Sequence, residues 1–328
     1  MVVNEMSSKY LVTGCAGFIG MHLTKHLLKQ GYNVFGLDNL NNYYEPELKQ
    51  YRLAQLLPFK NFTFVQIDLV NREEIAKLFR KEKFDRVIHL AAQAGVRYSI
   101  EAPFTYVDSN LVGMMTILEG CRNNNVKHLV YASSSSVYGM NDKVPFAESD
   151  QVDSPVSLYA ATKKANELMA YSYAKLYNIP VTGLRFFTVY GPAGRPDMAP
   201  WLFTEAIIKG EPIKVFNHGK MMRDFTYIDD IVEGIFRIQN LIPNQKIPYS
   251  LFNIGNSKPI QLSHFIAAIE SATGKIANKI MMDMQAGDVE RTYADMSKLE
   301  KAVNYKPQTE IENGIKKFVD WYKEYKGI

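Results

Sequence analysis

At 328 residues, the chain is longer than most single compact domains, so we expect two lobes, or one large sheet domain with a smaller lobe appended. Hydrophobic residues make up 47% and charged residues 22%, as in ordinary soluble proteins, and a net charge of +4 does not imply nucleic-acid binding. The sequence contains no apolar run long enough to cross a membrane, and the start "MVVNEMSSKY" lacks the order of a secretory signal. We therefore expect a cytoplasmic protein that binds neither nucleic acid nor membrane.

From Lys9 to about residue 190, short apolar runs alternate with amphipathic stretches of three to four turns. This alternation is typical of successive βαβ units and predicts a doubly wound parallel sheet of the Rossmann type. The expected strands are Tyr10 to Thr13, Asn33 to Leu37, Phe62 to Ile67, Arg86 to Leu90, Leu129 to Ser133 and Val181 to Phe186. The expected helices between them include Phe18 to Gln30, Arg72 to Arg80 and Thr105 to Cys121.

The regular alternation of apolar runs and amphipathic stretches ends after "YGPAGRPDMAP". Shorter helices, the isolated strands "IKVF" and "SLFNIG", and turns marked by proline follow. We expect a first domain over residues 1–190 and a smaller mixed α/β lobe over residues 191–328, from which late segments can return to the first domain.

A glycine loop joins the first expected strand to the first helix. In "YLVTGCAGFIG", Gly14, Gly17 and Gly20 leave room for backbone amides at the amino end of a helix to approach a pyrophosphate. By itself this GxxGxxG spacing is a weak signal, because glycines at such a turn often serve turn geometry alone.

Polar or small residues also end the next three strands. Asp38, eighteen residues after Gly20, can accept hydrogen bonds from adenosine ribose hydroxyls and would repel a phosphate there, which favours NAD over NADP. The alternative is a solvated turn aspartate. Asp68 closes the third strand in the same way, and "HLAA" (His89 to Ala92) closes the fourth with small residues. Strand ends that face one crevice favour a dinucleotide site.

The fifth strand ends in a run of four serines, "YASSSSVYG". Tyr159 lies 25 residues beyond Ser134, and Lys163 follows four residues later on the same helical face. A free tyrosine has a pKa of about 10, and a neighbouring ammonium favours its phenolate, which can take a proton from a sugar hydroxyl as hydride leaves the same carbon. An isolated YxxxK is usually structural, but here it follows a nucleotide-binding pattern in the right order. We therefore interpret the serines as part of the active site, where their hydroxyls can form hydrogen bonds to the reacting oxygen, and not as a linker.

The two cysteines, Cys15 and Cys121, occur in no CxxC pattern and near no histidine ligand pattern. They are interpreted as small buried thiols, and neither a metal site nor a disulfide is expected.

The glycine loop, Asp38, the "SSSSVYG" block, YxxxK and "RFFTVYGP" together resemble the extended short-chain dehydrogenase/reductase family over nearly the whole chain. Within it, the chain is most similar to the UDP-glucuronate 4-epimerases, through "NLNNYYEPELKQYRL", "RFFTVYGPAGRPDMAP", "MMRDFTYIDD" and "GDVERTYAD". This resemblance implies tightly bound NAD+, a UDP-sugar substrate held by the carboxy-terminal lobe, and C4 epimerisation of UDP-glucuronate and UDP-galacturonate through a 4-keto intermediate.

The resemblance also implies site residues. Ser134, Tyr159 and Lys163 would be catalytic, with Tyr159 as the base. Cofactor contacts are expected at Gly14, Gly17, Phe18, Ile19, Gly20, Asp38, Asn39, Asp68, Leu69, Leu90, Ala91, Ala92, Gln93, Asn110, Tyr159, Lys163 and Phe187. Substrate contacts are expected at Arg97, Ser134, Ser135, Ser136, Tyr159, Thr188, Arg195, Met198, Val215, Phe216, Arg223, Asp288 and Arg291.

Ser135 and Ser136 bear on the fate of the intermediate. The resemblance implies that relatives which dehydrate or decarboxylate nucleotide sugars carry acidic residues at these places, and a serine cannot act as a carboxylate base. We expect Ser135, Ser136 and Thr188, helped by Arg195, to hold the sugar carboxylate so that the β-keto acid does not lose carbon dioxide.

Several alternatives remain open: an epimerase for neutral UDP-sugars such as UDP-glucose or UDP-N-acetylglucosamine, a UDP-glucuronate decarboxylase, and a regulator that binds NAD without chemistry. The helices over Thr105 to Cys121 and Val156 to Tyr177 are those through which such proteins commonly pair, and their apolar faces suit a homodimer.

Overall fold

The computed structural model describes residues 8–284 and 290–328, which form two compact units. The first unit consists of Met1–Asn141, Ser149–Phe186 and Ile235–Phe252, and the second of Asp142–Glu148, Phe187–Gly234 and Asn253–Ile328. The chain therefore passes between the units several times. No helix within the described residues is long and apolar enough to cross a membrane.

A seven-stranded sheet forms the centre of the first unit, in the order β10-β6-β5-β4-β1-β2-β3. The pairings that join β6 through β3 are all parallel, which confirms the predicted doubly wound fold. The strands are β1 (Lys9–Thr13), β2 (Asn33–Asp38), β3 (Phe62–Gln66), β4 (Arg86–His89), β5 (His128–Ser134), β6 (Val181–Phe186) and β10 (Tyr249–Ile254).

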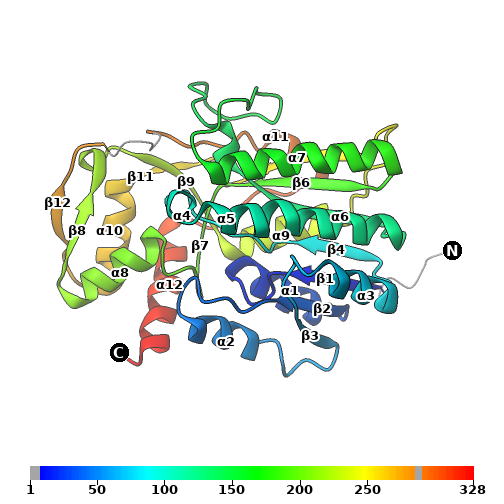
Figure 1. Ribbon diagram of the computed structural model, residues 1–328. Helices are drawn as coiled ribbons and strands as arrows, with labels where there is room; N and C mark the ends of the chain where they lie inside the picture. Colours follow the sequence, from blue (N-terminus) through cyan, green and yellow to red (C-terminus); the bar gives the residue numbers. More distant parts are fainter. Residues whose placement is uncertain (1–7, 285–289) are drawn as a thin grey trace. The chain divides into compact units, whose positions relative to one another are not determined.

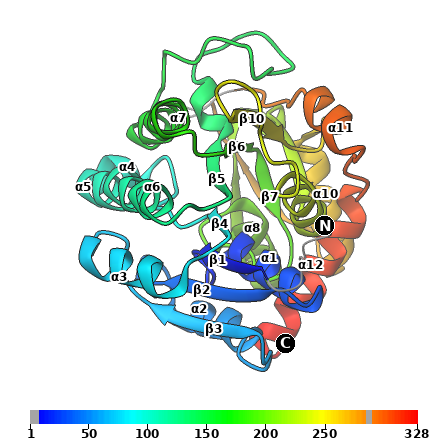
Figure 2. The ribbon, with the colours of Figure 1, turned by 90° about the vertical axis from the view of Figure 1, so that its right-hand side faces the viewer.

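Helices cover both faces of this sheet, with α3, α6 and α7 along one face and α1 along the other (Figure 2). Phe79 of α3, Ile117 of α6 and Ala170 of α7 pack with Leu129 and Tyr131 of β5 in one buried cluster. The helices of this unit are α1 (Phe18–Lys29), α2 (Pro46–Ala54), α3 (Arg72–Glu82), α4 (Tyr98–Glu101), α5 (Pro103–Tyr106), α6 (Gly113–Asn123) and α7 (Leu158–Tyr177).

One expectation about these elements was wrong, and another needs refinement. The stretch "SLFNIG", expected as an isolated strand of the smaller lobe, is β10 and extends the central sheet beside β6. The start of β10 is held beside β6 by the Val181 N–H, which donates to the Pro248 carbonyl at 2.8 Å. The helix expected over Thr105 to Cys121 is present, but it contains a π-helical turn, η2 (Val107–Val112), between α5 and α6.

The second unit contains a three-stranded sheet, β11-β9-β7, and a two-stranded sheet, β12-β8 (Figure 1). Phe225 and Phe265 stack 4.3 Å apart in its core, and Trp201 meets Tyr322 edge to face at 5.2 Å. Its elements are β7 (Thr188–Tyr190), α8 (Ala199–Lys209), β8 (Pro212–Val215), β9 (Met222–Tyr227), β11 (Pro259–Gln261), α10 (Leu262–Thr273), β12 (Asn278–Met281), α11 (Ser297–Val303) and α12 (Ile311–Lys326). Helix α9 (Ile228–Ile238) runs from the second unit into the first.

Candidate active site

The glycine loop lies where the strand order of the central sheet reverses, between β1 and β4. Gly14 has a φ of +73°, and a Cβ there would lie 2.9 Å from the Ala91 nitrogen in the segment after β4. A Cβ on Gly20 would lie 1.9 Å from the Gly14 carbonyl oxygen. Both positions therefore require glycine, and the loops after β1 and β4 meet at the switch point where doubly wound sheets bind nucleotides.

The amino end of α1 is suited to an anion. Helix α1 begins at Phe18 and Ile19, directly after Gly17, and no side chain caps it among the described residues. Its first turn carries no acidic residue. The unsatisfied N–H groups and the positive end of the helix dipole favour a phosphate here. These residues therefore fit the pyrophosphate of a dinucleotide.

Asp38 connects the end of β2 to this loop. The side chain is 7% exposed, and it accepts hydrogen bonds from the Ala16 N–H at 3.1 Å and the Leu40 N–H at 2.9 Å. Asn39 reaches Asp68 beyond β3, donating to its carboxylate at 2.8 Å. The structure thus brings the polar ends of β2 and β3 together, and the remaining lone pairs of Asp38 suit ribose hydroxyls.

The thiol of Cys15 in this loop is buried, as is that of Cys121 in α6, and burial raises the pKa of each. Neither thiol is activated as a nucleophile in this environment.

The end of β4 is fixed by a histidine. The Thr13 hydroxyl accepts from the Ala91 N–H at 3.2 Å and shares a second hydrogen bond with His89 Nδ1, 2.8 Å away. Burial, and secondarily the charge of Lys163, lowers the pKa of His89 to about 3. His89 is therefore neutral and serves as a fixed brace for the segment that carries Leu90, Ala91 and Ala92.

Asn110 on η2 binds Gln93, the residue that follows Ala92 in the segment after β4. Its side chain accepts from the Gln93 N–H at 2.8 Å and donates to the Gln93 carbonyl and to Thr162 Oγ1, each at 3.0 Å. Thr162 precedes Lys163 on α7. Asn110, expected as a cofactor contact, thus joins the end of β4 to α7, and it does so from the π-helical turn.

Tyr159 and Lys163 lie one turn apart on α7, with the Lys163 ammonium 6.0 Å from the centre of the Tyr159 ring. Lys163 is 3% exposed and donates to the Ala132 carbonyl at 2.9 Å. Burial lowers its pKa to about 8. A cation held this way favours the anionic form of a neighbouring phenol.

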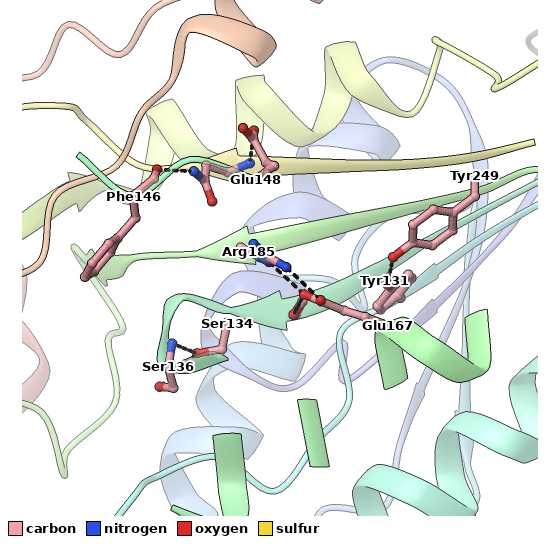
Figure 3. A network of polar contacts seen from close by, with 10 residues as sticks. Tyr131, Ser134, Ser136, Phe146, Glu148, Glu167, Arg185 and Tyr249 are labelled. Carbon is pink, nitrogen blue, oxygen red and sulfur yellow. Dashed lines mark hydrogen bonds and ion pairs between the residues drawn. The ribbon is translucent and has the colours of Figure 1, made fainter. Parts of the chain in front are cut away.

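The serines form a tight turn at the end of β5, which we call the serine turn (Ser134–Ser136). Ser134 caps the short 3₁₀ helix Ser135–Tyr138, accepting from the Ser136 N–H at 3.2 Å, and its Oγ lies 3.1 Å from Ser136 Oγ. Figure 3 shows Ser134 and Ser136 side by side. Their hydroxyls form one polar surface at the carboxyl end of the strand.

Ser133 has a different role, which the sequence interpretation missed. Its hydroxyl donates to Glu167 Oε1 at 2.7 Å. Glu167 forms a bidentate pair with Arg185 of β6, with both N–H···O contacts at 2.8 Å (Figure 3). The only sequence signal was the placement of Glu167 four residues after Lys163, on the same helical face.

Two of the predicted arginines are brought together in the second unit. Arg291 pairs through its backbone with Met222, and Arg223 donates to the Glu290 carbonyl at 3.2 Å. Next to Arg223 in the chain, the fully buried Asp224 accepts from the N–H groups of Asn256 at 2.7 Å, Ser257 at 3.1 Å and Ala294 at 3.0 Å. Burial raises the pKa of Asp224, and these donors oppose that effect. Asp224 is a second residue that sequence reasoning missed.

The other predicted substrate residues, and the predicted cofactor residues Phe187 and Leu69, are spread over both units. Arg195 is ion-paired with Asp197, its Nε 3.0 Å from Oδ1. In the second unit, Phe187 precedes β7, Thr188 begins it, Met198 precedes α8, Val215 ends β8, and Phe216 follows it. In the first unit, Arg97 is exposed before α4, and Leu69 follows β3. Asp288 lies outside the described residues.

The sequence profile of the NAD dependent epimerase/dehydratase family matches residues 10–255, and the chain belongs to this family. It is 54% identical to Protein CapI of Staphylococcus aureus over 97% of this chain and 99% of that protein. It is 45% identical to a probable UDP-glucuronate 4-epimerase of Rhizobium meliloti (strain 1021), over 96% of this chain and 97% of that protein.

A crystal structure of the UDP-glucuronic acid 4-epimerase from Bacillus cereus, in complex with UDP-glucuronic acid and NAD, matches with a TM-score of 0.89. It is 34% identical and covers 97% of this chain and 99% of its own. The resemblance predicted from the motifs is thereby confirmed.

Proposed function

We propose that this protein is an NAD-dependent UDP-glucuronate 4-epimerase that interconverts UDP-glucuronate and UDP-galacturonate. The observation that carries the proposal is the buried Lys163, fixed on the Ala132 carbonyl at 2.9 Å and placed 6.0 Å from the Tyr159 ring, at the strand end that bears the serine turn. The named UDP-glucuronate 4-epimerases among its relatives support the choice of substrate.

The bound dinucleotide supplies a hydride acceptor at sugar C4 in the first half of the reaction and a hydride donor in the second. Tyr159 takes the O4 proton as C4 is oxidised to a ketone, and it returns the proton when C4 is reduced from the opposite face. Ser134 donates a hydrogen bond to O4, and Lys163 stabilises the phenolate throughout. Because the hydride is returned to the same carbon, no net redox change results.

The remaining residue roles are part of the proposal. Arg223 and Arg291 bind the diphosphate, because a guanidinium suits phosphate oxygens, while Phe216 contacts the uracil. Arg97, Met198 and Val215 complete the substrate contacts. Ser135, Ser136, Thr188 and Arg195 hold the sugar carboxylate and restrain the loss of carbon dioxide. Arg195 would have to share its guanidinium with Asp197, the partner it contacts here.

A homodimer is also proposed. Several apolar side chains of α5 and α7 are exposed, including Phe104 at 81%, Leu168 at 58% and Leu176 at 69%. Such side chains on neighbouring helices suit a self-complementary interface. We further propose that the enzyme works in the cytoplasm and supplies a sugar acid for polysaccharide synthesis.

The test is to incubate the purified protein with UDP-glucuronate, without added cofactor, and to resolve the products by chromatography and NMR. UDP-galacturonate without carbon dioxide is expected, and Tyr159→Phe should abolish turnover while bound NAD is retained. A UDP-pentose product would indicate a decarboxylase. Faster turnover of UDP-glucose than of UDP-glucuronate would indicate a neutral-sugar epimerase, and turnover of neither would point to a regulator.

A further inference from the structure

We propose that Ser133, Glu167 and Arg185 are positioning residues for the epimerisation and that they fix the serine turn relative to the catalytic helix α7. The inference rests on the proposed function, because it concerns the same reaction. None of the three residues is expected to touch substrate or cofactor.

The Glu167–Arg185 pair is almost completely removed from water, with side chains 5% and 2% exposed. Its two parallel N–H···O contacts, each at 2.8 Å, fix the relative orientation of the carboxylate and the guanidinium. Burial acts to lower the pKa of Arg185, but the hydrogen bonds and charge of Glu167, together with Tyr138, outweigh it and raise that pKa, so the guanidinium stays charged. Buried pairs of this kind are weak sources of net stability, which makes a role in specifying geometry the better explanation.

The pair contacts residues that flank the serine turn on both sides. On the amino side, Glu167 accepts the Ser133 hydroxyl at 2.7 Å, one residue before the turn. On the carboxyl side, the Arg185 guanidinium lies over the Tyr138 ring at 4.8 Å, two residues after the turn. The residues between these contacts are Ser134, Ser135, Ser136 and Val137. A displacement of the pair would therefore displace the hydroxyls of the turn.

The same helix carries the reacting group. Lys163 binds the Ala132 carbonyl and Glu167 binds the next residue, Ser133, from successive turns of α7. Arg185 stands directly opposite Ser133 in the β5–β6 pairing. Strand, helix and turn are thus joined at consecutive residues, and the distance between the Tyr159 oxygen and the serine hydroxyls is set by these contacts.

The direct test is Ser133→Ala, which removes the link to the turn and leaves the Glu167–Arg185 pair intact. Since misplacement of reacting groups by about 1 Å can cost up to about a hundredfold in rate, we expect kcat to fall about tenfold. KM should change less than about twofold, and the share of decarboxylated product should rise, because the turn would hold the carboxylate less firmly. Ser133→Thr, which keeps the hydroxyl, should restore both kcat and the product ratio.

Tyr249→Phe is the matched control. It removes the hydrogen bond between the Tyr131 and Tyr249 hydroxyls, at 2.9 Å in the same buried region, without touching the serine turn (Figure 3). It should lower thermal stability about as much as Ser133→Ala and leave kcat and the product ratio unchanged. Bound NAD, measured after denaturation, should match wild type in all variants.

A wild-type product ratio and kcat in Ser133→Ala would overturn the proposal, as would equal losses in Tyr249→Phe or no recovery in Ser133→Thr. The double variant Glu167→Met/Arg185→Met removes both charges together and gives an independent check, since it should fold but lose kcat. If the wild-type protein itself does not epimerise UDP-glucuronate, the proposed function fails. The positioning role is then tested by comparing the kcat of each variant with that of the wild type on whichever substrate the wild type turns over.

Discussion

Lys163 and Glu167, one turn apart on α7, bind consecutive residues of β5: Lys163 donates to the Ala132 carbonyl at 2.9 Å, and Glu167 accepts from Ser133 Oγ at 2.7 Å. One helical face therefore carries both the cation and the anion that contact the end of β5. Since residues four apart share a helical face, the backbone of α7 itself sets the spacing of these two contacts.

The pKa of Lys163, lowered by burial to about 8, predicts a limit to activity at high pH. Above this pH the ammonium loses its proton, and Tyr159 loses the charge that favours its phenolate. We expect kcat to fall by up to tenfold per pH unit above about pH 8. Measuring kcat against pH at saturating UDP-glucuronate checks this, and a profile that stays flat well above pH 8 would contradict it.

Two buried histidines predict a loss of stability in acid. Burial is the largest cause that lowers the pKa of His89 to about 3 and of His128 to about 4. Below about pH 6.5 the unfolded chain therefore binds protons that the native state does not, so the free energy of unfolding falls as pH falls, by up to about 1.4 kcal/mol per pH unit for each histidine.

Urea unfolding at neutral and mildly acidic pH tests this, with His128→Gln as the diagnostic variant. His128 binds the Gln239 carbonyl and Thr182 Oγ1, each at 2.9 Å, and a neutral amide can replace part of this bonding. The variant should be less stable at neutral pH and lose less on acidification. An unchanged acid dependence would exclude His128 as a contributor.

Gly20→Ala should empty the cofactor site. Its Cβ would lie 1.9 Å from the Gly14 carbonyl oxygen, so the glycine loop must open, at a cost of about 1–3 kcal/mol in folding free energy. Bound NAD, quantified after denaturation, should drop severalfold. Gly274→Ala is the matched control: its φ of +71° makes alanine strained by about 1–2 kcal/mol, but nothing lies within 4 Å, and NAD content should not change.

Asp224→Asn should weaken substrate binding from a distance. The carboxylate accepts three backbone N–H groups that hold the segments beside Arg223 and Arg291, and an amide turns one acceptor into a donor. We expect a loss of about 3 kcal/mol in stability and a severalfold higher KM for the UDP-sugar. The exposed Asp229→Asn provides the comparison. If both variants keep wild-type KM, Asp224 does not organise the arginines.

Strands β1 to β6 were predictable because each is a short apolar run bounded by turn residues, and each observed bound lies within one residue of the expected one. The glycine loop, Asp38, Tyr159 and Lys163 were singled out through local spacing. The turn η2 was not, because its i→i+5 pattern leaves no mark in hydrophobic periodicity. The place of β10 depends on a pairing distant in sequence, which local patterns do not encode.

The serine run also shows that local sequence patterns do not reveal contacts between residues distant in sequence. Ser133 and Ser134 are chemically identical, yet Ser133 follows the alternation of Leu129 and Tyr131, whose side chains pack in the cluster with α7. Strand alternation alone would have assigned Ser133 to that side. Its partner Glu167 and the pair with Arg185 become visible only when helix and sheet are assembled.

The position of β10 in the central sheet has a consequence for synthesis on the ribosome. Strand β6 is buried along its whole length and pairs with β5 on one side, while its neighbour on the other side is β10. Residues 187–234, which belong to the second unit, are translated between them. During that interval the nascent chain presents, with an open edge, a strand that is buried in the native fold, which is the kind of surface that chaperones protect and that aggregation exploits.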